Sequence, residues 1–229
     1  MSLVELREVK KYYHNGESII RAADGVSLRI ERGEFSVLAG PSGSGKTTIL
    51  NLIGGLDRPD SGEVFVDGDN LTKKDQKALS RIRRHKIGFI FQAYNLVPVL
   101  TAEENAEFVL MLNGVPAKER SQRVLALLKE MGMSGLEYRK PGEMSGGQQQ
   151  RVAVARAMVT EPVIILADEP TANLDSESSI NLLNLMRRFN ETKGITFLFS
   201  SHDERVIHLA KRIIHLRDGK IESDQREGL

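Results

Sequence analysis

The feature that most constrains this chain is the stretch over residues 40–48, which reads GPSGSGKTT. It fits the pattern G-x-x-x-x-G-K-[ST], in which the backbone N–H groups of a glycine-rich loop curl around phosphate oxygens. The apolar run Phe35–Ala39 before it predicts a buried strand, and residues 48–53 after it predict a helix. The N-terminus of that helix adds the positive end of its dipole at the same place. Strand, loop and helix together predict a phosphate-binding loop (P-loop) in an α/β fold.

Two side chains of the loop and two carboxylates elsewhere complete the expected chemistry. Lys46 would reach the β- and γ-phosphates, and the Thr47 hydroxyl would bind magnesium. The apolar run 164–167 ends in Asp168 and Glu169. We expect this run to form a strand next to the P-loop strand, so that Asp168 holds magnesium and Glu169 polarises the attacking water. The alternative is an ordinary acidic turn at the end of a strand.

The pattern along the chain predicts how the core is built. Residues before the P-loop alternate between apolar and polar and predict an antiparallel β region, whereas strands alternate with helices in the last third, which favours a mainly parallel sheet with covered faces. A final helix–strand unit should end near residue 219. Residues 101–138 have a helical period. We therefore expect one domain over 1–229, with a core from 1–95 and 160–229 and an inserted helical subdomain over 96–159.

Composition excludes several classes of protein. The net charge is +1, so there is no electrostatic case for nucleic acid, and without cysteine there is no disulfide or thiolate chemistry. No apolar run approaches the ~18 residues of a membrane span, so any membrane role must come through a partner. The basic run over 81–86 is open to two interpretations, a nucleic-acid contact or the solvated end of a helix that packs Leu79 and Ile82 inward. We favour the second.

A second candidate phosphate site lies at residues 145–148, which read SGGQ. Ser145 and Gln148 have the spacing of a capping box at a helix N-terminus. Capping does not explain Gly146 and Gly147, because each glycine in a first turn costs about 1 kcal/mol relative to alanine. They are tolerated where something must approach the backbone closely, and a γ-phosphate fits that role. The chain then carries two phosphate-binding helix N-termini.

In combination these motifs resemble the ATP-binding cassette (ABC) family, specifically its nucleotide-binding subunits, over essentially the whole chain. The mild departures are Met144, where the family places leucine, and a variant D-loop over 172–175. The resemblance implies a P-loop NTPase core of α/β class with an N-terminal antiparallel β region and an inserted helical subdomain. It matches residues 40–48 to Walker A, Gln92 to the Q-loop, 145–148 to the signature motif, 168–169 to Walker B, 173–175 to the D-loop and His202 to the switch histidine.

The resemblance also implies a role for each matched residue, with ATP and Mg²⁺ as cofactors. Glu169, His202, Lys46 and Gln92 would be catalytic, and Thr47, Gln92 and Asp168 would serve the metal. Tyr13 sits where the family stacks an aromatic ring on adenine, with its neighbour Tyr12 left open. The ATP-binding set would be Tyr13, Gly40, Ser42, Gly43, Ser44, Gly45, Lys46, Thr47, Thr48, Ser145, Gly146, Gly147, Gln148 and Asp175.

The partners implied are a second copy of the chain, which completes two ATP sites head to tail, and integral membrane permease subunits. The segment 91–105 resembles the lipoprotein-releasing, macrolide-efflux and antimicrobial-peptide-resistance group. The expected function is therefore a transport ATPase on the inner face of the cell membrane, with export and extraction both open. The alternatives are a soluble ABC ATPase without a membrane partner and a non-hydrolysing regulatory cassette. The latter is disfavoured because the catalytic set is intact: Lys46, Asp168, Glu169 and His202.

Overall fold

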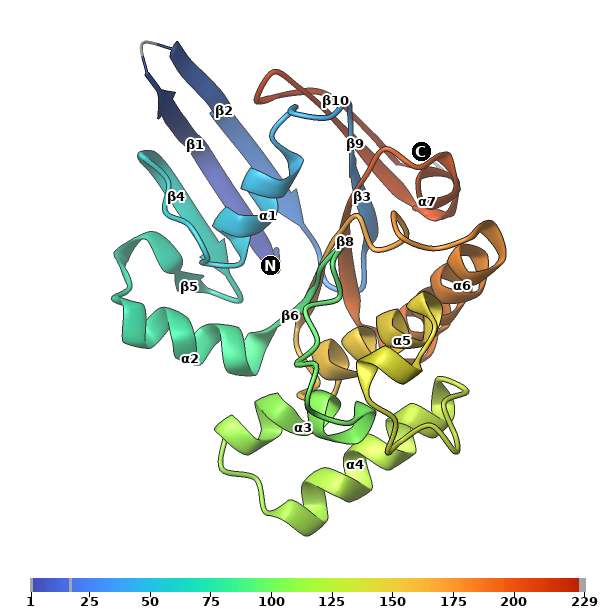
Figure 1. Cartoon of the computed structure of the whole chain (residues 1–229). Helices are drawn as coiled ribbons and strands as arrows, with labels where there is room; N and C mark the ends of the chain where they lie inside the picture. Colours follow the sequence, from blue (N-terminus) through green and yellow to red (C-terminus); the bar gives the residue numbers. More distant parts are fainter. Residues whose placement is uncertain (1, 17, 227–229) are drawn as a thin grey trace.

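Two sheets organise the residues described by this computed structural model, 2–16 and 18–226 (Figure 1). The smaller sheet is antiparallel, in the order β2-β1-β4-β5. It confirms the expected antiparallel region at the N-terminus and continues it beyond the P-loop. Its strands are β1 (Val4–Asn15), β2 (Ser18–Ile30), β4 (Ser61–Val66) and β5 (Asp69–Asn70).

The larger sheet has the order β10-β9-β3-β8-β7-β6. All its neighbouring pairs are parallel except β9 and β10, which confirms the expected mainly parallel sheet. The expectation that the last unit ends near residue 219 missed β10, which returns as a hairpin at the sheet edge. The strands are β3 (Phe35–Ala39), β6 (Ile87–Ile90), β7 (Ile164–Asp168), β8 (Thr196–Ser201), β9 (Arg212–Arg217) and β10 (Lys220–Arg226).

One expectation about this sheet is wrong: β7 does not lie next to the P-loop strand β3. Strand β8 lies between them and pairs with both, through Ala39 with Ser201 on one side and Asp168 with Ser200 on the other. The two positions where β8 meets its neighbours' ends are therefore serines. Small side chains there leave room for the Thr47 hydroxyl of the P-loop to reach Asp168 at the end of β7.

Seven α-helices and two short 3₁₀ turns complete the described part. Helices α3 and α4 lie at the end of the molecule away from the antiparallel sheet, and α5 packs between them and the larger sheet (Figure 1). These helices carry the expected insertion, while its limits at 96–159 stay a prediction. The helices are α1 (Lys46–Ile53), α2 (Gln76–Lys86), α3 (Ala102–Leu112), α4 (Ala117–Glu130), α5 (Gly146–Met158), α6 (Ser176–Lys193) and α7 (Glu204–Leu209), with 3₁₀ turns at Leu71–Lys73 and Pro141–Glu143.

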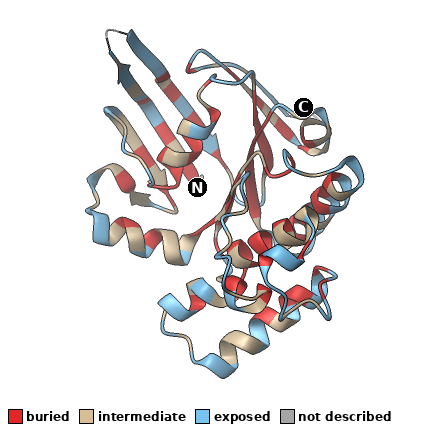
Figure 2. Cartoon of the chain, viewed as in Figure 1, coloured by how far each residue is buried: buried red, intermediate tan, exposed pale blue. Residues whose placement is uncertain are grey.

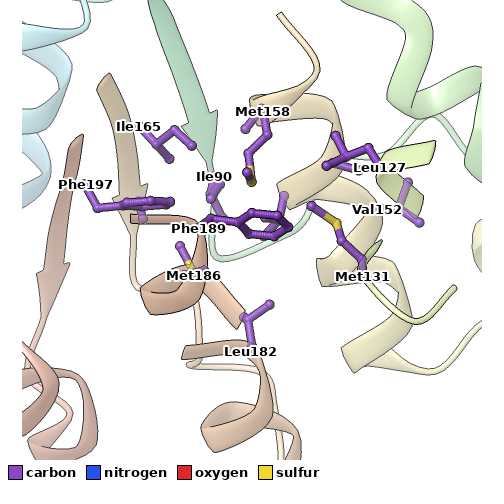
Figure 3. Close-up of a cluster of buried hydrophobic side chains, with 14 of the residues drawn as sticks. Ile90, Leu127, Met131, Val152, Met158, Ile165, Leu182, Met186, Phe189 and Phe197 are labelled. Atoms are coloured by element: carbon purple, nitrogen blue, oxygen red, sulfur yellow. The ribbon is translucent and has the colours of Figure 1, made fainter. Parts of the chain in front are cut away.

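Buried side chains form two clusters on the two faces of the larger sheet. Successive strand residues point to opposite faces: on β7, Ile164 and Leu166 join the cluster shared with α1 and the antiparallel sheet, whereas Ile165 and Ala167 join the other. That second cluster takes in α4, α5 and α6, whose side chains converge in Figure 3. In Figure 2 the strands β3, β6, β7 and β8 are mostly buried, while the edge strand β10 and the outer faces of α3 and α4 are exposed. The P-loop helix and the helical insertion thus pack on opposite faces of one sheet.

The basic run at 81–86 forms the end of α2. Leu79 and Ile82 are buried, as the helix interpretation predicted. The Arg83 guanidinium donates to the carbonyl oxygen of Gly55 at 2.6 Å, and Lys86 forms ion pairs with two aspartates of the β4–β5 turn. The run is thus largely used in contacts within the chain.

Candidate active site

The chemistry-bearing residues gather at the carboxyl ends of four parallel strands. The P-loop follows β3, Gln92 follows β6, Asp168 and Glu169 end β7, and His202 follows β8. Ligands of open α/β sheets bind at this edge, because the loops there converge.

Glycine is required at two positions of the P-loop. Gly45 has φ 104°, and a Cβ atom there would lie 2.0 Å from the carbonyl oxygen of Ala22. A Cβ atom on Gly40 would lie 2.2 Å from the carbonyl oxygen of Leu216. Gly45 is also the N-cap of α1, so no side chain caps this helix. The first N–H groups of α1 are therefore left to bind an anion.

The polar side chains of the loop fit a phosphate group. Lys46 is buried, and its ammonium donates to the carbonyl oxygens of Gly40 at 2.8 Å and Pro41 at 2.9 Å. An ammonium has three donors, so one remains for a phosphate oxygen. The Ser44 hydroxyl is buried with no hydrogen-bond partner among the described residues. A buried polar atom without a partner is costly, and a phosphate oxygen would satisfy it.

The donors for a metal ion also fit. The Thr47 hydroxyl donates to Asp168 Oδ1 at 3.0 Å, so a hydroxyl of helix α1 and a carboxylate of strand β7 meet here. Mg²⁺ prefers such hard oxygen ligands and typically takes one or two carboxylates together with substrate phosphates. No group of three or more His, Cys, Asp or Glu side chains suited to a metal occurs within residues 2–16 and 18–226. The site therefore suits Mg²⁺ shared with a nucleotide.

Glu169 and His202 form a hydrogen-bonded pair beside that position. Glu169 Oε1 lies 2.8 Å from His202 Nδ1, and the Ser201 hydroxyl donates to Glu169 Oε2 at 3.2 Å. An ionised carboxylate only accepts hydrogen bonds, so Nδ1 carries the proton, and Nε2 has no hydrogen-bond partner among the described residues. Glu169 has φ 45°, a conformation that costs roughly 1–3 kcal/mol for a non-glycine residue. Backbone strain at the carboxylate that follows a strand is typical of active sites.

The structure places Gln92 on an exposed turn after β6. Its carbonyl oxygen accepts from Asn173 Nδ2 of the D-loop at 2.9 Å, and no side-chain hydrogen bond of Gln92 is found in the described part of the chain. Sequence reasoning missed Arg156, which holds this turn. Arg156 of α5 donates to the carbonyl oxygens of Tyr94, at 2.8 Å, and Asn95, whose φ angles are 55° and 52°. Burial lowers the pKa of the Arg156 guanidinium.

The signature residues begin α5 with the predicted capping box. Ser145 Oγ accepts from the Gln148 N–H at 3.3 Å, and Gln148 Oε1 accepts from the Ser145 N–H at 3.0 Å. A Cβ atom on Gly146 would lie 2.8 Å from the Tyr94 hydroxyl. Packing within the chain therefore supplies a reason for this glycine that the sequence did not reveal. No hydrogen bond joins residues 145–148 to the P-loop within the described residues, and in Figure 1 α5 lies away from α1.

Two further candidates have partners in their own chain. The Tyr13 hydroxyl donates to Asp57 at 2.7 Å, and burial raises the pKa of this phenol, which also neighbours Thr48 of α1. Tyr12 instead bonds Asp24 of β2, so Tyr13 is the tyrosine with a contact to the P-loop helix. Asp175 caps α6 and accepts from the Ser178 N–H at 2.8 Å. Its bonds from Ser178 lower the pKa of Asp175.

A groove of about 350 Å³ lies between the core and the helical insertion. Its walls include Phe89 of β6, Val109 of α3 and Arg156 of α5, and it also contains Arg83 and Arg84 of α2. No carboxylate is among its lining residues. Apolar side chains stand exposed around and beyond it: Leu56, Val97, Val99, Phe108, Met111 and Leu112.

The site combines a P-loop with an aspartate suited to bind Mg²⁺ and a glutamate that is hydrogen-bonded to a histidine. This combination defines a P-loop nucleotide hydrolase. A profile of the ABC transporter family matches residues 23–172. The chain belongs to this family and is an ABC ATPase cassette.

Relatives and solved structures agree with this assignment. The macrolide export ATP-binding/permease protein MacB of Hyphomonas neptunium is 48% identical over 222 residues, which are 97% of this chain but 34% of that protein. The chain therefore spans about a third of the length of this relative. The lipoprotein-releasing system ATP-binding protein LolD 1 of Chlorobium chlorochromatii is 44% identical, over 98% of this chain and 92% of that protein. The ATP-binding cassette MJ0796, solved as a dimer with ADP and Pi, superposes with a TM-score of 0.91 at 45% identity, covering 97% and 98% of the two chains.

Proposed function

We propose that this cassette hydrolyses ATP with Glu169 as the general base and His202 as its partner. The observation that carries the proposal is the Glu169–His202 hydrogen bond beside the Thr47–Asp168 contact. Glu169 would take a proton from the attacking water, and the free Nε2 of His202 would contact the γ-phosphate. Lys46 would bind the β- and γ-phosphates. The chemistry that Mg²⁺ supplies when bound is neutralisation of phosphate charge.

Gln92 belongs to this proposal as a residue that moves. Its turn is tied to the D-loop through Asn173 and to α5 through Arg156. Movement of this turn toward Thr47 and Asp168 would carry the Gln92 side chain to the metal position. The same movement would then shift both the D-loop and the helical insertion.

We further propose that two copies assemble head to tail around two ATP molecules. Residues 145–148 lie apart from the P-loop of their own chain, and a dimer would bring them to the P-loop of the partner. Asp175 and Tyr13 would complete the nucleotide contacts. The support from relatives is that MJ0796 has been solved as a dimeric cassette.

The groove between core and insertion is the proposed docking site for a membrane permease. Apolar walls with arginines, surrounded by exposed apolar side chains, suit a short amphipathic segment of a partner protein. No helix in the described part of the chain is long and apolar enough to cross a membrane. By likeness to MacB and LolD, the cassette would act on the inner face of the cell membrane. It would power export or extraction of a lipid, lipoprotein, peptide or drug.

The first test is Glu169→Gln, with Glu222→Gln as a matched control on the exposed strand β10. Glu169→Gln should bind ATP with parental affinity and hydrolyse it at least about a hundredfold more slowly, because general bases contribute 10²–10⁴ in rate. It should also accumulate an ATP-bound dimer in size-exclusion chromatography with light scattering. Parental turnover in Glu169→Gln would exclude Glu169 as the base.

The second test addresses the permease. The tagged Glu169→Gln chain, with ATP to hold complexes, is recovered from detergent-solubilised native membranes. Recovery of one integral membrane protein in fixed stoichiometry is expected, and replacing Phe108 and Met111 of α3 with serine should reduce it. Recovery of only this chain, or of soluble partners, would support the soluble ABC ATPase instead.

A further inference from the structure

Ser200 is a buried hydroxyl in a strand whose preceding residues are apolar. It lies on β8 after Phe197, Leu198 and Phe199, and its side chain is fully buried. A hydroxyl at such a position costs free energy unless it is hydrogen-bonded. The expectations drawn from the sequence gave it no role.

The partner of Ser200 is the carboxylate expected to serve the metal. Ser200 pairs with Asp168 across the β7–β8 ladder, and its hydroxyl donates to Asp168 Oδ1. The Thr47 hydroxyl donates to the same oxygen at 3.0 Å. No hydrogen bond to Oδ2 is present within residues 2–16 and 18–226. Two hydroxyls thus fix one oxygen of Asp168 and leave the other available.

The next residue on the strand holds a different carboxylate. Ser201 donates to Glu169 Oε2 at 3.2 Å and accepts from the Asp203 N–H at 3.0 Å. Adjacent serines on the strand between β3 and β7 therefore each contact one of two adjacent acids. Because the two acids have different expected roles, the two serines should affect different steps.

We propose that Ser200 is a positioning residue that sets the affinity of the site for Mg²⁺ by orienting Asp168. Ser201 correspondingly affects the rate of ATP hydrolysis, because it orients Glu169. Both statements rest on the proposed function of this site. Ser200 acts through Asp168 and does not itself contact nucleotide. Partners that orient a metal ligand typically change metal affinity about 10- to 100-fold when removed.

The test compares Ser200→Ala, Ser200→Thr and Ser201→Ala with the parent chain. Binding of the fluorescent nucleotide N-methylanthraniloyl-ATP is measured in EDTA and then during titration with MgCl₂, followed by steady-state hydrolysis. Ser200→Ala should raise the half-effective Mg²⁺ concentration about tenfold, with parental nucleotide binding in EDTA and a parental melting temperature. Ser200→Thr should stay within about twofold of the parent, because it keeps the hydroxyl. Ser201→Ala should lower kcat about tenfold at a parental Mg²⁺ midpoint.

The outcomes separate this proposal from the one on which it rests. A parental Mg²⁺ midpoint in Ser200→Ala would overturn the positioning role, as would equal shifts in Ser200→Ala and Ser200→Thr. Equal weakening of binding with and without metal in Ser200→Ala would show a purely structural role and overturn it too. If the parent bound nucleotide without any response to Mg²⁺, the proposed function would fail first, and the role of Ser200 with it.

Discussion

The N-termini of α1 and α5 are both candidate phosphate sites, yet they are built in opposite ways. Helix α1 starts at Gly45, in a left-handed conformation, and no side chain caps it. Helix α5 starts at Ser145 with a complete capping box. The first helix leaves its N–H groups for a ligand, whereas the second satisfies part of its own.

This difference implies that the two helix N-termini have different roles in nucleotide binding. An uncapped helix start is stable only with a ligand or water on its N–H groups, so α1 should bind nucleotide in a single chain. A capped helix start is stable without a ligand and can stay exposed to solvent. We therefore expect α5 to contribute to nucleotide binding only when a partner brings a phosphate to it.

The largest expected effect separates the two sites by nucleotide affinity. Lys46→Ala should weaken ATP binding by the single chain roughly 10- to 100-fold, because hydrogen bonds to charged groups contribute about 1.5–3 kcal/mol. Ser145→Ala should leave that affinity unchanged and abolish the ATP-bound dimer of the Glu169→Gln background. Isothermal titration and light scattering measure the two quantities. Unchanged ATP binding in Lys46→Ala would contradict the P-loop assignment.

A second prediction compares one glycine from each site. Gly45→Ala should lower the free energy of unfolding by roughly 1–3 kcal/mol and abolish nucleotide binding, because its Cβ meets the Ala22 backbone and its φ is left-handed. In Gly146→Ala the added Cβ would lie 2.8 Å from the Tyr94 hydroxyl, the far end of a side chain, and 3.6 Å or more from its other neighbours. The melting temperature should therefore fall little while the dimer is lost.

The double variant Gly146→Ala/Tyr94→Phe tests whether glycine is needed at position 146 because of Tyr94 or because of a phosphate. If the dimer stays absent, the glycine is needed for the approach of a phosphate. If the dimer returns, packing against Tyr94 is the whole reason for Gly146, and the phosphate role of this position is wrong.

A third prediction concerns stability. Ser145→Ala should cost about 1 kcal/mol, the usual value of an N-cap, and Ser145→Thr should cost less. Thermal unfolding measures the cost, and faster exchange of the Gln148 amide should locate it. Equal melting temperatures for all three chains would show that the capping box does not stabilise α5.

The smallest expected effect is a pH dependence of the stabilisation that the charged N-cap Asp175 gives to α6. Asp175 caps α6, and hydrogen bonds from Ser178 lower its pKa below the ordinary 3.8. Its contribution is therefore present above the unfolded-state pKa and lost as the pH falls through the lower folded-state value. The Ser178 amide shift in NMR should titrate below pH 4, whereas Gln148, behind the neutral Ser145 cap, should not. In Asp175→Asn the Ser178 titration should vanish.

The fold could be predicted largely from local patterns, because Phe35–Ala39 is a short apolar run and the capping box at Ser145 marks the start of a helix. The position of β8 between β3 and β7 could not, since strand order depends on contacts between segments far apart in the chain. The same limit hid Ser200, Tyr94 and Arg156, which act through partners distant in sequence. Two adjacent serines ending the apolar strand over 195–199 were the available signal for hydroxyls with a buried partner.

The helical insertion has no interior of its own. Leu110 of α3, Leu128 of α4 and Val152 of α5 belong to the same buried cluster as Phe35 and Phe197 of the sheet. Grafting this segment from another cassette would therefore require repacking, because the donor's side chains must fit against the recipient's sheet residues. Chimeras that exchange the segment together with the facing strand residues should be the ones that fold.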